Sequence, residues 1–576
     1  MKKIFFSILL LAAVAVIYGQ SGIENRKESK QTTICNPLNL SYRFCLDNPS
    51  RREAADPTMV MFKDEYYLFA SKSGGYWHSS DLINWDLITS ADLPLEDYAP
   101  TVVEMRDTLF FMASASAPIK IFKTAKPKTG KWQVAKADFP IGLTDPCLFL
   151  DDDARLYLYY GCSNIKPIYG VELDPKNFKP VGKPVECFNS NKADYGWEMT
   201  GDYNNMPENP WIEGPWMTKY KDRYYLQYAI PGTQFKSYCD GVYVADKPLG
   251  PYKLATNNPF SSKPEGFIDG AGHSSTFKDK YGNYWHISTL TISQKHMFER
   301  RLGLFPTFFD KDGTLYTYTV FGDFPFTIPQ KKISSPNELL IQGMLLSYKK
   351  PVEVSSELAG HPKSFVNDED VRSYWSAQTG NKGEWITIDL GKQCSVNAVQ
   401  INFSENNTKI LGRNPKIYYR YLLEYSDNNK SWKTLEDKRL NNTDVPHDYI
   451  QLSPSVKGRY IRLTNYYIPD GTFSLSDLRI FGKAQGNLPS TVENFDIIRN
   501  QKDKREVTIK WNKQPGDVGY NIRYGSEPNK LYHNWQVLGI DTLTIRNLNR
   551  LQEYYFTIDA FNETGVKRGD NVVVVR

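Results

Sequence analysis

The chain has 576 residues, which is too long for one compact core, so we expect two to four domains. Aromatic residues are numerous, led by 38 tyrosines, and with 38 glycines and 34 prolines this mixture favours β-sheet over helix bundles. The formal net charge of +5 is small and the basic residues are interspersed with acidic ones, which excludes the electrostatic footprint of a nucleic-acid-binding protein.

The N-terminal sequence MKKIFFSILLLAAVAVIYGQSG places two lysines before an apolar run of about fifteen residues, which small and polar residues follow. This order is typical of a secretory signal peptide over residues 1–20, with cleavage near Gly19 or Gln20. A retained membrane anchor is the alternative, but the run is short for a span of roughly twenty residues. We expect an exported protein, periplasmic or extracellular, with no membrane span in its mature form.

The seven cysteines are odd in number and none has C-x-x-C spacing, which argues against a zinc site and against a disulfide scaffold. Cys35 and Cys45 could close a small loop in an oxidising compartment. At least one thiol is expected to stay free.

A repeated pattern of a polar turn followed by an aromatic-rich strand runs through the first half of the chain. Its copies are DEYYLFAS from Asp64, RDTLFFMAS from Arg106, DARLYLYYG from Asp153, KDRYYLQYA from Lys221 and YGNYWHIS from Tyr281. Their spacing of roughly 43 to 67 residues is the length of one four-stranded propeller blade with loop insertions. The pattern predicts a five-bladed β-propeller over residues 36–328. A β-sandwich is the alternative, but one sandwich does not need this length.

The segments that open these repeats read AADPTMVMF, YAPTVVEMR, TDPCLFLDD, IEGPWMTKY and GAGHSSTFK, and four of them carry an ionisable residue: Asp56, Asp145, Glu213 and His273. In a propeller the first strand of each blade is the innermost, so these side chains should converge on the central axis. Converging carboxylates repel one another, and such a cost is typical of a functional site.

Past residue 328 the blade pattern stops. Residues 340–484 contain alternating strands without a repeat, and residues 489–576 contain strands spaced as in a small sandwich. GKAQGNLPST is the predicted linker between these two domains.

Three converging carboxylates suit the cleavage of a glycosidic bond. One carboxylic acid protonates the leaving oxygen, a carboxylate acts from the opposite face of the sugar, and a third carboxylate raises the pKa of the donor. By type, Asp56 in a short polar turn is the general base that holds a water. Glu213 among Trp211, Pro215 and Trp216 is the general acid, because this apolar setting favours its neutral form; Asp145 orients or tunes Glu213.

The first 330 residues resemble glycoside hydrolase family 43. The resemblance rests on ADPTMVMFKDEYYLFAS, TDPCLFLDDDARLYLYYG and IEGPWMTKYKDRYYLQYA, which occur in the order of the family's base, pKa-modulating and acid motifs. It implies a five-bladed propeller glycosidase with Asp56, Asp145 and Glu213 in those roles. One departure is YAPTVV, where many relatives have an acid after A-P.

The resemblance also implies substrate-binding residues. GAGHSSTF and RRLGLFPTFFDKDGTLY point to His273 near a central ion or water and to Arg300 reaching the sugar. Tyr98, Trp197 and Trp216 are further candidates for sugar contact. The chemistry requires no cofactor, and His273 is the candidate ligand of a structural calcium or sodium ion in the propeller channel.

Each candidate also has a purely structural interpretation. Asp56 and Asp145 precede proline and could simply form turns. Arg300 could pair with Glu299 or exchange roles with Arg301, and Trp197 could belong to the core. His273 lies in a Gly-rich turn, where a structural histidine is common. The set, rather than any single residue, points to a site.

The two later domains resemble known β-sandwiches. YWSAQTGNKGEWITIDLG and YIRLTNYYIPDGTFSLSDLRIFG resemble the discoidin, or coagulation-factor type C, fold used by sugar-binding modules, with Tyr374 as a possible loop platform and Trp375 and Trp385 in the core. Residues 489–576 resemble a fibronectin type III domain, whose default role is a spacer.

The leading hypothesis is an exo-acting, inverting α-L-arabinofuranosidase that removes terminal pentose from plant polysaccharide side chains. Rivals in the same family are β-xylosidase and β-galactosidase or galactofuranosidase, because loop shape sets the substrate. A catalytically inert sugar-binding propeller is the rival from another class. We expect a monomer whose partner is an oligosaccharide or polysaccharide, and a propeller that turns over small substrates without residues 340–576.

Overall fold

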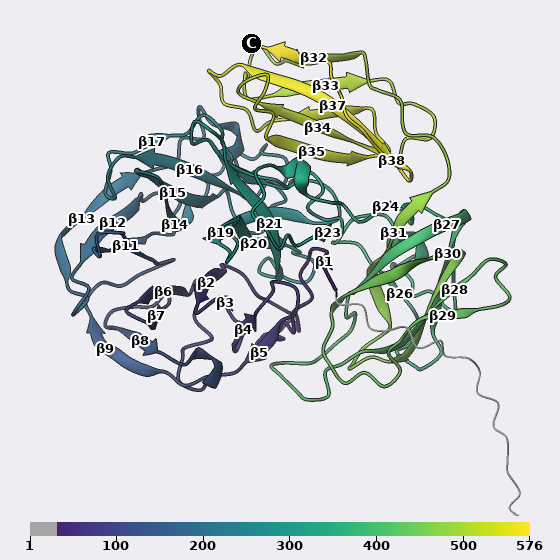
Figure 1. The fold of residues 1–576 in the computed structure, drawn as a ribbon, viewed down its shortest axis with the longest axis horizontal. Coiled ribbons are helices and arrows are strands. Elements are labelled where there is room, and N and C mark those ends of the chain that lie inside the picture. Colours follow the sequence, from purple (N-terminus) through teal and green to yellow (C-terminus); the bar gives the residue numbers. More distant parts are fainter. Residues whose placement is uncertain (1–30) are drawn as a thin grey trace, which may run out of the picture. The chain divides into compact units, whose positions relative to one another are not determined.

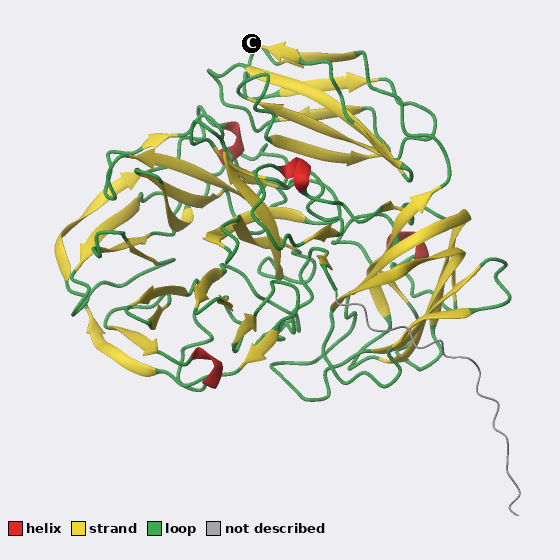
Figure 2. Ribbon diagram, in the orientation of Figure 1, coloured by secondary structure: helices red, strands yellow, loops and turns green. Residues whose placement is uncertain are grey.

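The structure is a computed structural model, and it describes residues 31–576. The predicted signal peptide lies outside the described residues. These are almost entirely strands and loops (Figure 2), and their helix is confined to four short 3-10 turns: η1 (Pro127–Thr129), η2 (Gly196–Glu198), η3 (Pro336–Glu338) and η4 (Lys363–Val366). No helix in this part of the chain is long and apolar enough to cross a membrane.

Five antiparallel sheets follow one another in chain order and form the blades of a propeller (Figure 1). In each blade consecutive strands pair, as the polar turns between aromatic-rich strands predict. The innermost strands contact one another in the closed order β2, β6, β10, β14, β19 and back to β2, so the sheets surround one axis. The predicted five-bladed propeller is therefore confirmed.

The blade strands have the following bounds. The first two blades are β2 (Thr58–Phe62), β3 (Glu65–Phe69), β4 (Tyr76–Ser79), β5 (Asp86–Ile88), and β6 (Thr101–Met105), β7 (Thr108–Met112), β8 (Ile119–Thr124), β9 (Gln133–Phe139). The third is β10 (Cys147–Leu150), β11 (Leu156–Tyr160), β12 (Ile168–Leu173), β13 (Pro180–Phe188). The last two are β14 (Glu213–Tyr220), β15 (Arg223–Ile230), β16 (Cys239–Ala245), β17 (Lys253–Leu254), with β18 (Ser261–Ser262) on β16, and β19 (Asp269–Lys278), β20 (Tyr284–Thr291), β21 (Arg300–Phe309), β22 (Leu315–Thr317).

The N-terminal segment packs along the last blade. Strand β1 (Thr33–Ile34) pairs with β23 (Phe326–Thr327), and the buried side chain of Asn36 donates to the carbonyls of Leu304 and Gly322. Both ends of the propeller sequence are thus fixed to the same blade.

The second domain has an eight-stranded sheet built on two long strands, β27 (Trp385–Phe403) and β30 (His447–Tyr467). Its other strands are β24 (Met344–Leu345), β25 (Val352–Val354), β26 (Trp375–Ser376), β28 (Arg420–Ser426), β29 (Lys433–Asp437) and β31 (Ser474–Ala484). They enclose one apolar core that includes the fully buried Trp375, as predicted, whereas Trp385 is half-buried. The ring of Tyr374 stacks on His361 with centroids 4.1 Å apart.

The third domain is a β-sandwich. One sheet contains β32 (Phe495–Arg499), β33 (Val507–Trp511) and β36 (Thr542–Ile545); the other contains β34 (Gly519–Gly525), β35 (His533–Leu538), β37 (Tyr554–Asn562), β38 (Gly565–Lys567) and β39 (Val573–Val575). A shared core around Trp535 joins the sheets. The assignment to the fibronectin type III class stays a prediction.

The three domains meet in one apolar cluster that includes Phe324 of the propeller segment, Phe481 of the second domain and Phe561 of the third. Cys35 lies in this cluster, and all seven cysteines are free. The predicted Cys35–Cys45 disulfide is wrong, because Cys35 is buried at this junction whereas Cys45 donates to Glu53 at 3.3 Å within the propeller. The expectation of a free thiol is confirmed.

Candidate active site

A left-handed backbone conformation recurs at the start of every blade. Five residues occupy it, with φ between 43° and 57°: Asp56, Ala99, Asp145, Gly214 and His273. In the first three blades this residue stands two positions before the innermost strand, whereas Gly214 and His273 lie within β14 and β19. Aspartate tolerates this region better than most residues, and glycine adopts it freely. The D-P and E-G-P openings therefore have a backbone reason as well as a chemical one.

The amide groups of these five residues all donate to side-chain acceptors from a neighbouring strand or loop. The five hydrogen bonds are Asp56 N to Thr289 Oγ1 (2.9 Å), Ala99 N to Ser71 Oγ (2.8 Å), Asp145 N to Ser114 Oγ (2.9 Å), Gly214 N to Asp145 Oδ2 (3.2 Å) and His273 N to Asp240 Oδ1 (2.8 Å). The side chains that start each blade are therefore fixed before a ligand arrives.

Glu213 was expected at the position equivalent to Asp56, Asp145 and His273, but the structure places Gly214 at that position. Gly214, not Glu213, has the left-handed conformation that Asp56, Asp145 and His273 share. A β-carbon at Gly214 would stand 2.5 Å from Cδ2 of His273, so the glycine leaves room for the imidazole. Glu213, one position earlier, reaches the site from a different backbone position.

Asp56 is almost fully buried and has three side-chain partners. Ser71 donates to Oδ2 at 2.5 Å, Arg300 donates to Oδ1 at 3.2 Å, and Nδ1 of His273 lies 3.1 Å from Oδ1. Burial alone would raise the pKa of Asp56, but Arg300, His273 and the Ser71 hydrogen bond outweigh burial and lower it. Asp56 is therefore an ionised carboxylate at neutral pH, as a general base requires.

The pKa of Asp145, unlike that of Asp56, is raised. Burial, with the charges of Glu213 and Asp56, raises its pKa to about 7 even though His273 and the amide of Gly214 act against the shift. His273 lies between the two aspartates, with Nδ1 3.8 Å from Oδ2 of Asp145. Burial lowers the pKa of this imidazole, but Asp56, Asp145 and Glu213 raise it above its usual value. His273 thus lies between the two aspartates, which favour its charged form.

Glu213 is half-buried at the start of β14 and both of its carboxylate oxygens accept hydrogen bonds. Tyr238 donates to Oε1 at 2.5 Å and Cys162 donates to Oε2 at 3.2 Å. The predicted apolar setting is only partly present, since Trp211 is 45 % exposed. The ligand atoms of Asp145, Cys162 and Glu213 lie within 4.8 Å of one another, so the carboxyl groups of Asp145 and Glu213 are close neighbours.

Sequence reasoning missed Cys162 and Tyr238. A signal for Cys162 existed, because it lies two residues after β11 just as Ser71 and Ser114 lie two residues after β3 and β7. The repeat endings LFAS, FMAS and YYGC align these three positions. Tyr238 lies in the loop before β16, and no repeat marks it.

Arg300 and Tyr98 lie beside Asp56. The guanidinium of Arg300 joins Asp56 to Glu53, to which it donates at 2.7 Å, and its carbon lies 6.0 Å from the centre of the Tyr98 ring. Arg301 instead contacts His447 of the second domain, so the two arginines do not exchange roles. Contact of Arg300 and Tyr98 with sugar stays a prediction.

Trp216 contributes to a ring of contacts between the innermost strands. Residues two or three positions after the left-handed residues bond to a neighbouring blade. Thr58 donates to Pro100 O (2.7 Å) and Trp216 Nε1 to Thr276 O (3.0 Å) of the following blade, whereas Leu148 N donates to Thr101 (3.0 Å), Met217 N to Cys147 (3.5 Å) and Met59 N to Ser275 (3.0 Å) of the preceding blade. The indole NH of Trp216 therefore joins two blades, and its contact with sugar stays a prediction.

The prediction that Trp197 lines the pocket is wrong. Trp197 is 1 % exposed and packs on Tyr228, and its indole NH donates to Asn549 of the third domain at 2.9 Å. No ring face of Trp197 is free for a sugar, because its indole is buried between Tyr228 and the third domain. Its neighbour Glu198 is fully buried against Tyr228.

The calcium or sodium ion expected at His273 stays a prediction. In residues 31–576 the His, Cys, Asp and Glu ligand atoms that cluster within 4.8 Å belong to Asp145, Cys162 and Glu213, and His273 is not among them. Nδ1 of His273 faces Asp56.

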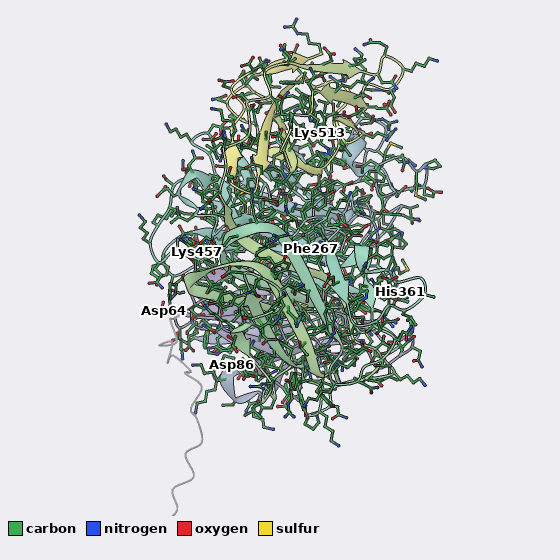
Figure 3. The ribbon with its side chains drawn as sticks, turned by 90° about the vertical axis from the view of Figure 1, so that its right-hand side faces the viewer. Asp64, Asp86, Phe267, His361, Lys457 and Lys513 are labelled. Carbon is green, nitrogen blue, oxygen red and sulfur yellow. The ribbon has the colours of Figure 1, made fainter. Side chains whose placement is uncertain are left out.

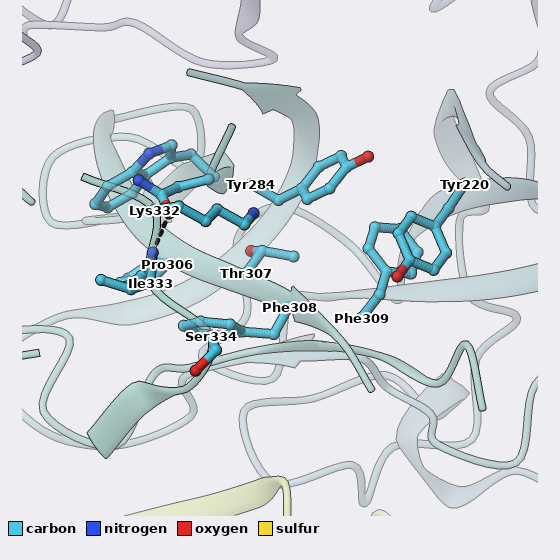
Figure 4. A pocket seen from close by; sticks show the side chains of 11 residues that line it. Tyr220, Tyr284, Pro306, Thr307, Phe308, Phe309, Lys332, Ile333 and Ser334 are labelled. Carbon is cyan, nitrogen blue, oxygen red and sulfur yellow. Dashed lines mark hydrogen bonds between the residues drawn. The ribbon is translucent and has the colours of Figure 1, made fainter. Parts of the chain in front are cut away.

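A hollow of about 220 Å³ lies at the other end of strand β14 from Glu213. Tyr220, Tyr284 and Phe309 line it together with Lys332 (Figure 4), and the rings of Tyr220 and Phe309 stack with centroids 4.0 Å apart. The strand separates this hollow from the carboxylates by its whole length of eight residues, so the hollow is not part of the acid–base centre.

The ionised Asp56 and the protonatable Asp145 are joined by His273, and Glu213 lies beside Asp145. This arrangement supplies one base and one acid for hydrolysis of a glycosidic bond. The fold and the centre define a glycoside hydrolase.

Comparisons with known proteins give the family. Residues 46–315 match the model of glycosyl hydrolases family 43, and residues 351–474 match that of the F5/8 type C domain. The propeller therefore belongs to glycosyl hydrolases family 43, and the second domain is of the discoidin-like F5/8 type C class.

Two relatives and one solved structure illustrate the similarity. A β-D-galactofuranosidase of Aspergillus niger is 24 % identical over 275 residues, which are 40 % of this chain and 72 % of that protein. A xylosidase/arabinosidase of Butyrivibrio fibrisolvens is 27 % identical over 212 residues, or 31 % of this chain and 38 % of that protein. A thermostable family-43 glycoside hydrolase of known structure has 22 % identity and a TM-score of 0.41, and covers 49 % of this chain and 95 % of its own.

Proposed function

We propose that the protein is an exo-acting, inverting glycosidase that releases terminal α-L-arabinofuranose from polysaccharide side chains. Asp56 is the general base that activates a water, Glu213 is the general acid, and Asp145 orients and tunes Glu213. The observation that carries this proposal is that the pKa of Asp56 is lowered and the pKa of Asp145 is raised, although both aspartates contact His273.

The choice of sugar rests on the relatives. The relative from Butyrivibrio is named for xylose and arabinose, and the relative from Aspergillus for galactofuranose. Arabinofuranose shares its five carbons with xylose and its ring size with galactofuranose, so it is the sugar with one feature of each. A terminal β-D-galactofuranosidase is the second candidate, favoured by the match over 72 % of the Aspergillus enzyme.

The remainder of the polysaccharide needs space beside the acid. An open hollow of about 450 Å³ is lined by the loops at 202–206, 234–235 and 293–297 and by Arg372 of the F5/8 type C domain. The middle loop belongs to the segment that ends at Tyr238, the partner of Glu213, and includes Thr233, which contacts Arg300. We assign this hollow to the sugar units that remain attached to the leaving oxygen.

A panel of aryl glycosides tests the proposal. The purified protein is assayed on aryl α-L-arabinofuranoside, β-D-xyloside and β-D-galactofuranoside, with Asp56→Asn as the inactive control and with identification of the released sugar. The arabinofuranoside should be the preferred substrate. Preference for the galactofuranoside would select the second candidate, and release of no sugar from aryl glycosides or side-chain oligosaccharides would overturn the enzymatic assignment of the site.

A further inference from the structure

A buried arginine joins the F5/8 type C domain to the start of the first blade. Arg52 is fully buried, and its guanidinium forms a two-pronged contact with Asp444 at 2.6 and 2.9 Å. It also donates to Glu405 and, at 3.2 Å, to the hydroxyl of Tyr419. All three partners belong to the second domain, so a charge of the propeller is neutralised only when that domain is in place.

Arg301 provides a second connection between the same domains. Its Nε donates to Nε2 of His447 at 3.0 Å, and its Nη1 donates to the carbonyls of Arg52 at 2.8 Å and Arg300 at 3.0 Å. Burial and the neighbouring arginines lower the pKa of His447 well below its usual value, so this histidine is neutral. Because Nε2 accepts, the proton lies on Nδ1, which faces Oδ1 of Asn402 at 2.9 Å.

Both connections end at the residues that surround the catalytic base. Glu53 follows Arg52 in the chain, and Arg300 precedes Arg301. Arg300 donates to Glu53 at 2.7 Å and to Asp56 at 3.2 Å, and all three side chains are at most 5 % exposed. A displacement of Arg52 or Arg301 would therefore move Glu53 and Arg300, and with them the charge that keeps Asp56 ionised.

We propose that the F5/8 type C domain holds the active site in its working geometry. In this proposal His447, Glu405 and Asp444 are positioning residues for Asp56 and Arg300. The proposal rests on the role of Asp56 as the base. It goes beyond that role because it gives a positioning function to a domain whose class suggests sugar binding alone. The second domain acts through the arginine pair and touches no substrate in doing so.

The proposal replaces an expectation drawn from the sequence, namely that residues 340–576 are dispensable for small substrates. Without them Arg52 would lose both carboxylates, and Arg301 would lose His447. A buried charge without its partner is costly, so the start of the first blade would rearrange. Truncation therefore cannot separate a positioning effect from a loss of folding, and point variants in the full-length protein are needed.

Four variants of the full-length chain test the inference on the aryl glycoside that the wild type cleaves. His447→Leu removes the acceptor of Arg301, whereas His447→Gln retains one, and Glu405→Gln removes a charge from Arg52. Glu369→Gln is the matched control, because Glu369 pairs with the fully buried Arg479. Arg479 packs on Phe267, the residue labelled in Figure 3, and contacts Asp323 rather than the base.

The expected result is a kcat lowered roughly 10- to 100-fold in His447→Leu and Glu405→Gln, in keeping with misplacement of a base by about 1 Å. The acidic limb of the kcat/KM profile should also move to higher pH, because Arg300 no longer lowers the pKa of Asp56. His447→Gln should retain most activity, and Glu369→Gln should keep the wild-type pH profile even when its melting temperature falls as far.

Three outcomes would overturn the inference: an unchanged acidic limb in folded His447→Leu and Glu405→Gln, an equal shift in Glu369→Gln, or no recovery in His447→Gln. If His447→Leu does not fold, Glu405→Gln decides. An active Asp56→Asn would reject the role of the base itself, which separates a failure of the proposed function from a failure of this inference.

Discussion

The imidazole of His273 lies against Gly214, so that a β-carbon on Gly214 would stand 2.5 Å from Cδ2 and 2.6 Å from Cγ of the ring. Gly214 also has a φ of 57°, which disfavours an L side chain. The glycine between Glu213 and Pro215 therefore serves the histidine of another blade, and that histidine holds the two aspartates together.

Gly214→Ala should lower kcat/KM by at least 10-fold, because the methyl group displaces His273 from Asp56. It should also destabilise the fold by about 1–2 kcal/mol, since alanine is strained in the left-handed region. Kinetics on an aryl glycoside and thermal unfolding measure the two effects. Gly182→Ala is the control: Gly182 has a φ of 86° but nothing within 4 Å of the added carbon, so it should show strain without loss of activity.

Asp56→Asn and Glu213→Gln should each lower turnover by at least 10²-fold, because each removes general base or acid assistance. The wild type should release sugar of inverted configuration, which requires a carboxyl separation of roughly 6.5 to 9.5 Å that leaves room for a water. NMR of the first-formed product decides this point. Product of retained configuration would show that Asp56 attacks the sugar directly.

The activity should fall as the pH rises through about 7, where Asp145 loses its proton. Asp145→Asn should move this alkaline limb away from pH 7, because the amide that replaces the carboxyl does not titrate. A pH profile of kcat/KM for both proteins measures the shift. An unchanged limb in the variant would mean that another group sets it.

The same carboxyl should influence stability with a defined sign. The pKa of Asp145 is raised from 3.8 to about 7 in the folded state, so the folded protein binds the proton more tightly than the unfolded chain. Its stabilising contribution is complete below pH of about 4 and is lost as the pH rises through 7. Asp145→Asn should remove this part of the pH dependence of the melting temperature.

Cys162 should resist alkylation at neutral pH although it lies beside the acid. Burial, together with the charges of Glu213 and Asp145, raises the pKa of this thiol far above its usual value, and only the thiolate reacts. Iodoacetamide should therefore leave activity intact for hours, whereas Glu213→Gln should increase the rate of labelling at Cys162, followed by mass spectrometry of the peptide. Faster labelling of the wild type than of the variant would contradict the contact between Cys162 and Glu213.

The hollow at the loops 202–206 and 293–297 should matter only for long substrates. Met206 and Met297 are exposed there, at 39 % and 45 %. Replacement of either by alanine should raise KM several-fold for a side-chain oligosaccharide and leave KM for the aryl glycoside unchanged. Met61→Ala, which changes a methionine of β2 with 36 % exposure, should affect neither substrate. Equal effects on both substrates would place the leaving group elsewhere.

The sequence by itself determined the five blades and the three carboxylates. Polar turns followed by alternating aromatic strands are local signals, and the left-handed positions before Pro57, Pro146 and Pro215 restrict which residues can stand there. Asp56, Asp145 and His273 were therefore found from spacing alone. The F5/8 type C domain was equally readable, because its strands carry their own alternating pattern.

Only the tertiary structure decided which groups meet. Tyr238 and Cys162 on Glu213, Trp197 on Asn549, and Arg52 on Glu405 and Asp444 join residues that lie 25 to 392 positions apart in the chain. Local propensity carries no information on such pairs, and a buried charge selects its partner through the packing of whole domains. For that reason the second domain, which the sequence presents as an appended module, contacts in the structure the two arginines next to Glu53 and Arg300, the neighbours of Asp56.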